Sequence, residues 1–209
     1  MSEPSLAFRG LRRGFGRLRV LEGVSGAVER GQVLLVTGAN GAGKSTLLRC
    51  LAGLLAPEAG TVELREGPEP LDPASRRRRV GYLAPDLAFY AELTAAENLR
   101  FYCKLRRLPT GLAAPLLDRV GVPADRLGGA LSSGMRQRLR WAWALLGRPA
   151  ALLLDEPFQN LDDEGVELAR ALLAEHLESG PVVVASPSAL ALPGVAGRLD
   201  LPTREASGA

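Results

Sequence analysis

The segment from residue 38 to residue 45 constrains the fold more than any other part of the chain. Its fixed positions Gly38, Gly43, Lys44 and Ser45 match the spacing G-x-x-x-x-G-K-[ST]. An apolar, β-branched run precedes it at residues 33–37, and the residues that follow it are apolar at helical spacing. The sequence therefore predicts a buried parallel strand, a glycine-rich loop and a helix, in that order.

A loop of this composition is suited to holding a polyphosphate. The glycines allow the backbone N–H groups to turn inward, and a helix that begins near Lys44 adds the positive end of its dipole. Lys44 is expected to reach the terminal phosphates, and the Ser45 hydroxyl to hold a magnesium ion. The alternative is a glycine-rich turn that merely precedes a helix, but the flanking segments favour the phosphate loop.

Composition limits the other classes of function. The chain has 209 residues and a formal net charge of +3, which fits one folding unit with an insertion. Four arginines at residues 76–79 stand just before an apolar strand, and we expect a solvated charged edge rather than a nucleic-acid patch. Aromatic residues are scattered and make up 5% of the chain, too few for a base-stacking platform. No nucleic-acid partner is expected.

The cysteines and the apolar segments indicate a cytoplasmic protein that does not itself cross a membrane. Cys50 and Cys103 lie outside any C-x-x-C pattern, so neither a disulfide framework nor a metal site is predicted. Residues 1–4 do not begin a secretory signal. The most apolar segments, residues 141–146 and 150–154, fall short of the roughly 18 residues that a membrane span needs.

Strands are predicted mainly from alternation and β-branched runs. Residues 6–28 alternate loosely between glycines, which indicates short antiparallel strands joined by turns. A proline-rich, acidic surface loop is expected at residues 67–73, and a short tail at residues 188–209. Further strands are expected at residues 60–64, 80–83, 151–155 and 181–186.

Helical periodicity appears in the middle of the chain. Thr94, with Glu97 three residues later, predicts a capped helix over residues 94–108. A second short helix is expected at residues 115–120. We therefore place a helical subdomain at residues 84–133, inserted into an α/β core formed by residues 1–83 and 134–209.

A second chemical signal follows the apolar strand at residues 151–154, which ends in Asp155 and Glu156. A carboxylate at such a strand end can hold magnesium, and its neighbour can take a proton from an attacking water. The pattern is weak alone and strong beside a phosphate loop. His176, the only histidine, lies at the edge of a one-faced helix and has no second candidate ligand nearby, so we expect a helix-boundary residue.

The order and spacing of these motifs resemble the ATP-binding subunit of an ABC transporter over nearly the whole chain. Residues 131–138 are similar to that family's signature sequence, with Ser133 in place of a glycine and Met135 in place of a glutamine. Residues 155–157 resemble the Walker B end, and residues 160–162 the D-loop. Phe15 occupies the place of the adenine-stacking aromatic, although an ordinary surface residue is the alternative.

The resemblance implies the fold and the ligands. The expected fold is an α/β P-loop NTPase core of RecA-like type, with an N-terminal antiparallel β subdomain and an inserted α-helical subdomain. The expected ligands are ATP and Mg²⁺, and the expected metal contacts are Ser45, Asp155 and Asp86. Glu156, Lys44, Ser132 and Gly134 are the expected catalytic residues. The nucleotide is expected to contact Phe15, Gly38, Asn40, Gly41, Ala42, Gly43, Lys44, Ser45 and Thr46.

The chain departs from the family pattern at two positions. The usual glutamine after the strand at residues 80–83 falls on Pro85 or Asp86, and the usual histidine after the last core strand is missing, since residues 185–188 are A-S-P-S. Both groups sense the terminal phosphate or position water in the family. We expect Asp86 to substitute in part, and a nucleotide-gated module with weak hydrolysis stays open as an alternative.

The family resemblance also implies partners. Two copies are expected to pair head to tail, with Ser132 and Gly134 of one facing the phosphate loop of the other. An integral-membrane subunit is expected to hold the pair at the cytoplasmic face of the membrane, and residues 87–90 are a candidate docking surface, with simple core packing as the alternative. The pattern at residues 93–102 is similar to the haem exporter of cytochrome c maturation, and equally to other exporters. A soluble ABC-type ATPase acting on ribosomes or DNA is disfavoured, because a single short cassette has no second cassette or long insertion.

Overall fold

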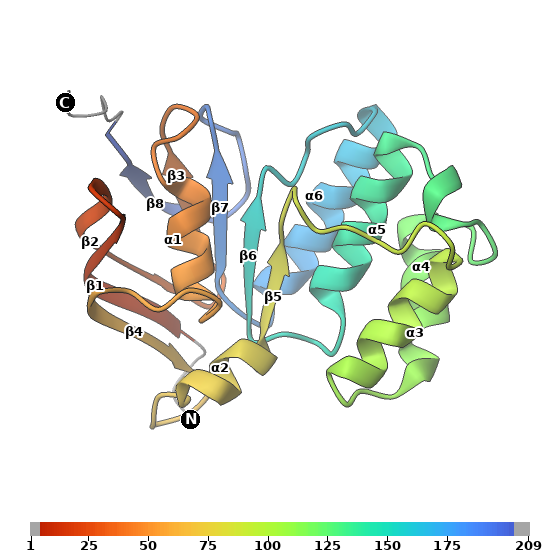
Figure 1. Ribbon diagram of the computed structural model, residues 1–209, viewed down its shortest axis with the longest axis horizontal. Coiled ribbons are helices and arrows are strands. Elements are labelled where there is room, and N and C mark those ends of the chain that lie inside the picture. The colour runs from red at the N-terminus through yellow and green to blue at the C-terminus, as the bar shows by residue number, and fades with distance from the viewer. Residues whose placement is uncertain (1–4, 203–209) are drawn as a thin grey trace.

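Two β-sheets of different kinds organise the computed structural model, which describes residues 5–202 (Figure 1). The first is antiparallel and has the strand order β2-β1-β4. Its strands are β1 (Ser5–Phe15), β2 (Leu18–Glu29) and β4 (Ala59–Arg65). The second is parallel and has the order β5-β6-β7-β3-β8. Its strands are β3 (Val33–Thr37), β5 (Val80–Leu83), β6 (Ala151–Asp155), β7 (Val182–Ser186) and β8 (Val195–Asp200).

Both faces of the parallel sheet are covered. Along β3, Val33 and Leu35 belong to one buried cluster, whereas Leu34 and Val36 belong to another. The cluster with Leu34 and Val36 lies under α1 (Lys44–Leu51) and the antiparallel sheet. The cluster with Val33 and Leu35 lies under α5 (Ser133–Leu145) and α6 (Asp163–Leu177). This double burial is why β3, β6 and β7 are continuous apolar runs.

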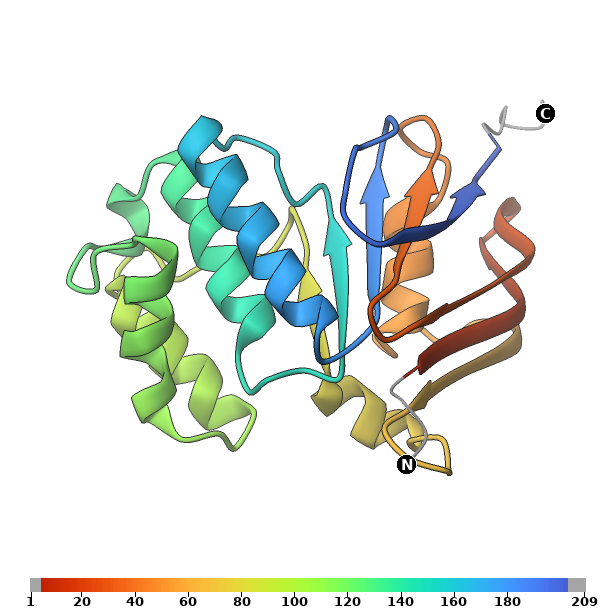
Figure 2. The ribbon, with the colours of Figure 1, turned by 180° about the vertical axis from the view of Figure 1, so that it is seen from behind.

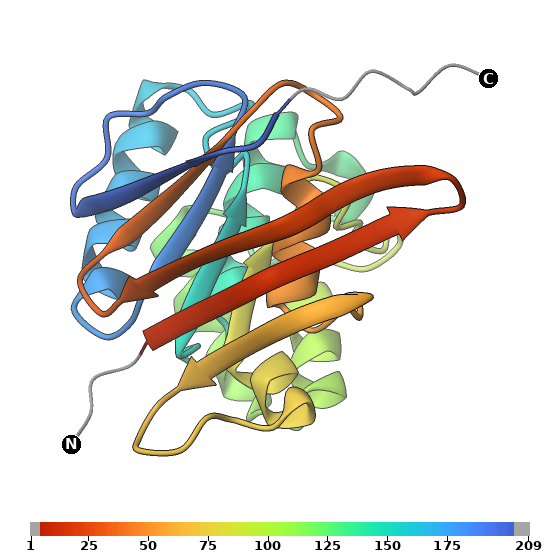
Figure 3. The ribbon, with the colours of Figure 1, turned by 90° about the vertical axis from the view of Figure 1, so that its left-hand side faces the viewer.

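The antiparallel sheet packs its apolar face against α1 (Figure 3). Leu6 and Phe8 of β1 are buried there, and Gly26 of β2 leaves room for the Phe8 ring, since a Cβ would lie 2.6 Å from it. The antiparallel strands predicted from residues 6–28 are confirmed, although they are longer than the alternation indicated.

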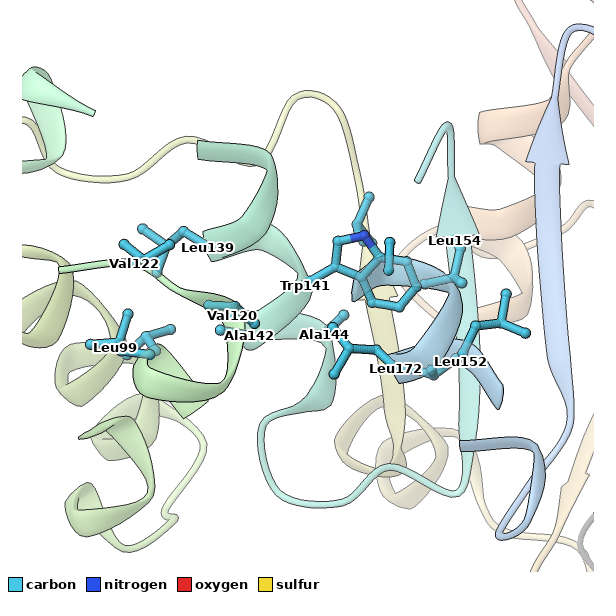
Figure 4. Close-up of a cluster of buried hydrophobic side chains, with 14 of the residues drawn as sticks. Leu99, Val120, Val122, Leu139, Trp141, Ala142, Ala144, Leu152, Leu154 and Leu172 are labelled. Carbon is cyan, nitrogen blue, oxygen red and sulfur yellow. The ribbon is translucent and has the colours of Figure 1, made fainter. Parts of the chain in front are cut away.

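Helices fill the chain between β5 and β6, at the end of the molecule farthest from the antiparallel sheet (Figures 1 and 2). They are α3 (Ala95–Leu105), η1 (Thr110–Leu112), α4 (Ala113–Val120), η2 (Gly128–Ala130) and α5. Thr94 and Glu97 form the predicted capping box of α3. Leu99, Val120 and Leu139 join this group to the core shown in Figure 4.

The solvated charged edge expected at residues 76–79 is wrong in part: the four arginines belong to α2 (Pro73–Arg79), and of them Arg77 and Arg78 are exposed. Asp72 caps this helix, with Pro73 in its first turn. Arg76 is only 7% exposed, and its Nη1 donates to the Val62 carbonyl at 2.6 Å. Arg79 pairs with Glu66 at 2.5 Å. Arg76 and Arg79 therefore hold α2 against neighbouring segments.

The tail expected from residue 188 is also wrong in part, because β8 adds a fifth strand beside β3. The rest of that expected tail, residues 203–209, lies outside the described residues, as do residues 1–4. Between residues 5 and 202, the helices are all too short or too polar to span a bilayer.

Candidate functional site

The loop between β3 and α1 lies at the carboxyl end of the parallel sheet, at the top of Figure 1. Gly38, Gly41 and Gly43 have φ values of 146°, 83° and 100°, a region that side chains disfavour. A Cβ on Gly38 would lie 2.6 Å from the Leu201 carbonyl oxygen, and one on Gly43 would lie 2.7 Å from Val20. The loop therefore needs glycine at these two positions on grounds of space as well as conformation.

The first turn of α1 is open to an anion. Gly43 offers no side-chain cap, and the turn contains no acidic residue. Lys44 is 6% exposed, and its Nζ donates to the carbonyls of Gly38 at 2.7 Å and Ala39 at 3.0 Å. These two contacts leave one of its three donors for a ligand.

Two carboxylates lie at the end of β6, where Asp155 is the last residue of the strand and Glu156 follows it. Asp155 is 1% exposed, and its Oδ2 has no hydrogen-bond partner among the described residues. Burial raises the pKa of Asp155, while Ser45 and Lys44 oppose the rise. Glu156 has a φ of 49°, a conformation that costs a non-glycine residue about 1–3 kcal/mol. Such strain at a carboxylate beside a phosphate loop points to a functional residue.

One cavity of about 290 Å³ joins the loop to the carboxylate. Its lining comprises Val20, Asn40, Gly41, Gly43, Lys44, Ser45, Thr46 and Glu156. Most of the residues predicted to contact a nucleotide are thus together. Gly38 and Ala42 do not line the cavity. Gly38 begins the loop, and Ala42 is buried.

The donor set suits Mg²⁺. This ion prefers hard oxygen ligands, and two are available here: the unpaired Oδ2 of Asp155 and the Ser45 hydroxyl. The Ser45 hydroxyl is near enough to Asp155 to lower the pKa of that carboxyl. No group of three or more His, Cys, Asp or Glu side chains within residues 5–202 forms a cage for a metal. Such a cage is not needed, because Mg²⁺ is held by one or two protein oxygens together with phosphates and water.

The signature residues lie away from this cavity. Ser132 caps α5 by accepting the Met135 N–H at 3.1 Å, and a Cβ on Gly134 would lie 3.2 Å from the Asn160 carbonyl oxygen. The first turn of α5 is nevertheless at the same end of the molecule as the phosphate loop in Figures 1 and 2. Neither residue lines the cavity of its own chain.

Two predicted site residues are placed differently from expectation. Asp86 pairs with Arg49 of α1 at 2.6 Å and lines a separate cavity, so this placement does not support a metal ligand. Phe15 is half exposed at the turn between β1 and β2, and the Arg13 guanidinium lies 5.0 Å from its ring centre. It is Val20 of β2, not Phe15, that lines the loop cavity.

Sequence reasoning missed the support beneath the loop. Thr37, the last residue of β3, donates its hydroxyl to Asp200 of β8, and the Arg198 Nε donates to Asp200 at 2.8 Å. The Leu201 N–H donates to the Thr37 carbonyl at 2.8 Å. No sequence signal indicated the contacts of Thr37 with β8, because they join residues more than 160 positions apart.

Strand, glycine loop, buried lysine and strand-end carboxylates define a P-loop nucleotide-binding protein by fold and site. A family model described as ABC transporter matches residues 21–159. The chain belongs to this ABC transporter family.

Curated relatives and a solved structure agree with this family. The chain is 39% identical over 168 residues to a sulfate/thiosulfate import ATP-binding protein of Bordetella bronchiseptica, covering 76% of this chain and 47% of that protein. It is 36% identical over 189 residues to the Nod factor export ATP-binding protein I of Ralstonia nicotianae, covering 88% of this chain and 59% of that protein. The chain thus spans about half the length of these relatives. A solved ATP-binding subunit of an ABC transporter superposes with a TM-score of 0.76 at 28% identity, over 87% of this chain and 78% of that one.

Proposed function

We propose that this chain binds ATP with Mg²⁺ and hydrolyses it to power a membrane transporter. The observation that carries the proposal is a cavity lined by both the phosphate loop and Glu156. A nucleotide whose phosphates lie on the loop brings its terminal phosphate towards this carboxylate. This arrangement supports Glu156 as the general base for the bond that hydrolysis breaks.

Each residue has a separate role in this proposal. The loop N–H groups bind the phosphate oxygens together with the Lys44 donor that the Gly38 and Ala39 carbonyls leave free. Ser45 and Asp155 would hold Mg²⁺, which would neutralise charge that develops on the phosphates. Glu156 accepts the proton of the attacking water. Asn40, Gly41 and Thr46 complete the phosphate contacts from the cavity wall.

The site is completed by a second copy of the chain. Ser132 is exposed at the first turn of α5 and does not reach the phosphate loop of its own chain. In a head-to-tail pair, its hydroxyl and the Gly134 N–H face the terminal phosphate of the other copy. ATP then lies between the two copies, and its hydrolysis separates them.

The membrane subunit docks on a cavity of about 410 Å³ between α1, β5 and the helical subdomain, residues 84–133. Leu87 and Ala88 line it, together with Tyr82 and Trp143. Tyr90, two residues after Ala88, is half exposed and packs edge-on against Phe101, with 5.2 Å between the ring centres. An apolar segment from a membrane protein suits this lining, and such a contact places the chain at the cytoplasmic face of the membrane.

The cargo and the direction of transport are separate questions. The relatives named above concern sulfate or thiosulfate import and Nod factor export, and neither name supports the haem-export hypothesis. We retain export as the direction suggested by the family resemblance of residues 93–102. Co-purification of the chain from membranes with its transmembrane subunit identifies the partner and, through it, the cargo.

A nucleotide-gated module with weak hydrolysis is the second candidate. Residues 185–188, at the end of β7 and just after it, contain no histidine where the family has one, and Asp86 is paired with Arg49. Both observations remove groups that would orient the attacking water. Turnover distinguishes the two candidates.

The experiment is a comparison of the wild-type chain with Glu156→Gln at saturating ATP and Mg²⁺. The substitution removes the base and leaves the loop intact, so we expect hydrolysis to fall at least about a hundredfold while ATP affinity changes less than about threefold. Equal turnover in the two proteins, with ATP bound by both, would establish the gated module instead.

A further inference from the structure

A hydrogen-bonded path joins the segment that lines the docking cavity to the backbone of Glu156. Its first link is Arg140 of α5, whose Nε donates to the Leu87 carbonyl at 3.2 Å. Its second link is from Arg140 Nη1 to Oε1 of Gln137, at 3.0 Å. Gln137 Nε2 then donates to the carbonyls of Glu156 at 3.1 Å and Pro157 at 3.0 Å.

Arg140 determines which way the Gln137 amide points. A guanidinium has only donors, so Gln137 presents its carbonyl oxygen to Arg140. The amide nitrogen must then face the two backbone carbonyls, which only accept. Gln137 is 1% exposed, so water cannot replace any of these partners at small cost.

Glu156 depends on these contacts because its own backbone is strained, with a φ of 49°. Its N–H donates to the Ala185 carbonyl at 3.0 Å, and its carbonyl accepts both Gln137 and the Gln159 N–H. The next carbonyl, that of Pro157, also accepts Trp141 Nε1 at 3.0 Å. Gln137 is thus the one side chain in this group that holds both carbonyls.

We propose that Arg140 and Gln137 are positioning residues for Glu156. They connect the conformation of Glu156 to the segment that contains Leu87. The inference rests on the proposed role of Glu156 as the base. The link between the docking cavity and the base is then made by Arg140 of α5. Asp86 does not make it, because its carboxylate is paired with Arg49.

The test uses three variants of the full chain and a control. Arg140→Met removes both donors at similar length. Arg140→Lys keeps a donor-only group, which still selects the amide orientation. Gln137→Glu keeps the shape but has no donor for the carbonyls. Arg65→Met is the control, because Arg65 also donates to a loop carbonyl, that of Pro68 at 2.6 Å, on a strand remote from Glu156.

We expect Arg140→Met and Gln137→Glu to lower kcat for ATP by about tenfold or more, with KM within about twofold of wild type. Arg140→Lys should recover part of the loss, and Arg65→Met should leave both constants unchanged. A purely structural role for Arg140 would instead lower the melting temperature with kcat per folded molecule intact. Wild-type kcat in Arg140→Met and Gln137→Glu would overturn the inference.

Hydrogen exchange gives a readout that does not depend on turnover. In the nucleotide-free chain, Arg140→Met should speed exchange of the amides in residues 156–161 at least about fivefold, with β6 unchanged. Unchanged exchange in that segment would overturn the inference. If the wild-type chain hydrolyses no faster than Glu156→Gln, the proposed function fails separately, and exchange alone decides whether Arg140 holds the segment.

Discussion

At the scale of single residues, the site combines a strained glutamate with an unsatisfied aspartate. Glu156 occupies a left-handed conformation, and Asp155 has a buried oxygen without a partner among the described residues. Each feature destabilises the folded chain by itself. In the proposed function both features are useful, because a bound Mg²⁺ would satisfy Asp155 and the strain would orient Glu156 towards the triphosphate.

His176 supplies a pH dependence of stability. Burial in the last turn of α6 lowers its pKa from 6.5 to about 4, and the Pro181 carbonyl opposes the shift only in part. Between these two values the unfolded chain binds a proton that the folded chain does not, so the free energy of unfolding falls as pH falls. The stability is fully present above about pH 6.5, and we expect a loss approaching about 3 kcal/mol near pH 4.

Urea unfolding at a series of pH values checks this expectation, with His176→Gln as the comparison. Glutamine does not titrate, so the variant should lose the part of the slope that lies between pH 4 and 6.5. The carboxylates whose pKa values are lowered, such as Asp72 and Asp200, contribute equally to both proteins. Parallel pH profiles for the two proteins would show that His176 is not held neutral.

At the scale of elements, local signals in the sequence predicted those elements that lie beside a short motif. Thr94 and Glu97 indicated α3, and the glycine loop indicated β3 and α1. The same chemistry at Asp72 and Pro73 marks α2, yet the run of arginines after it suggested a solvated edge. The burial of Arg76 depends on the Val62 carbonyl of another element, which no local pattern contains.

Long-range contacts explain the other failures of prediction. β8 has an exposed, weakly alternating sequence, and within the described chain it pairs only with β3, more than 150 residues earlier. Within the site, the loop and the carboxylates were predictable from spacing. The pairing of Asp86 with Arg49 was not, because it needs the relative position of α1 and the segment after β5.

The capping box of α3 can be measured directly. Thr94 accepts the Glu97 N–H at 3.2 Å, and the Glu97 carboxylate accepts the Thr94 N–H at 2.8 Å. Thr94→Ala removes the hydroxyl, and we expect the free energy of unfolding to fall by about 1 kcal/mol. Thr110→Ala, at an exposed residue without a capping contact, should change it by less than about 0.5 kcal/mol. Equal effects of the two substitutions would contradict a capping role.

At the scale of the whole molecule, the phosphate loop and the first turn of α5 share one end of the structure (Figure 1). This arrangement suits a head-to-tail pair in which each copy supplies half of two sites. In Figure 1 this end is the top of the view, with the antiparallel sheet to the left and the helical subdomain to the right. The same edge of the molecule therefore carries both halves of the site.

Light scattering after gel filtration tests the pair. With hydrolysis blocked by Glu156→Gln, ATP and Mg²⁺ should shift the chain from monomer to dimer, because the nucleotide is no longer consumed. Gly134→Asp should prevent the shift, since it places a negative charge where the γ-phosphate of the other copy is expected. A Glu156→Gln chain that stays monomeric with bound ATP would contradict the pairing.

Calorimetric titration of the purified chain with ATP in the presence of Mg²⁺ is the most direct test of the phosphate cradle. We expect a saturable heat of binding for the wild-type chain, with affinity reduced at least about tenfold in Lys44→Ala, because Lys44 is the one ammonium that lines the cavity. No heat of binding in the wild-type chain, or the same affinity in Lys44→Ala, would contradict nucleotide binding at this loop.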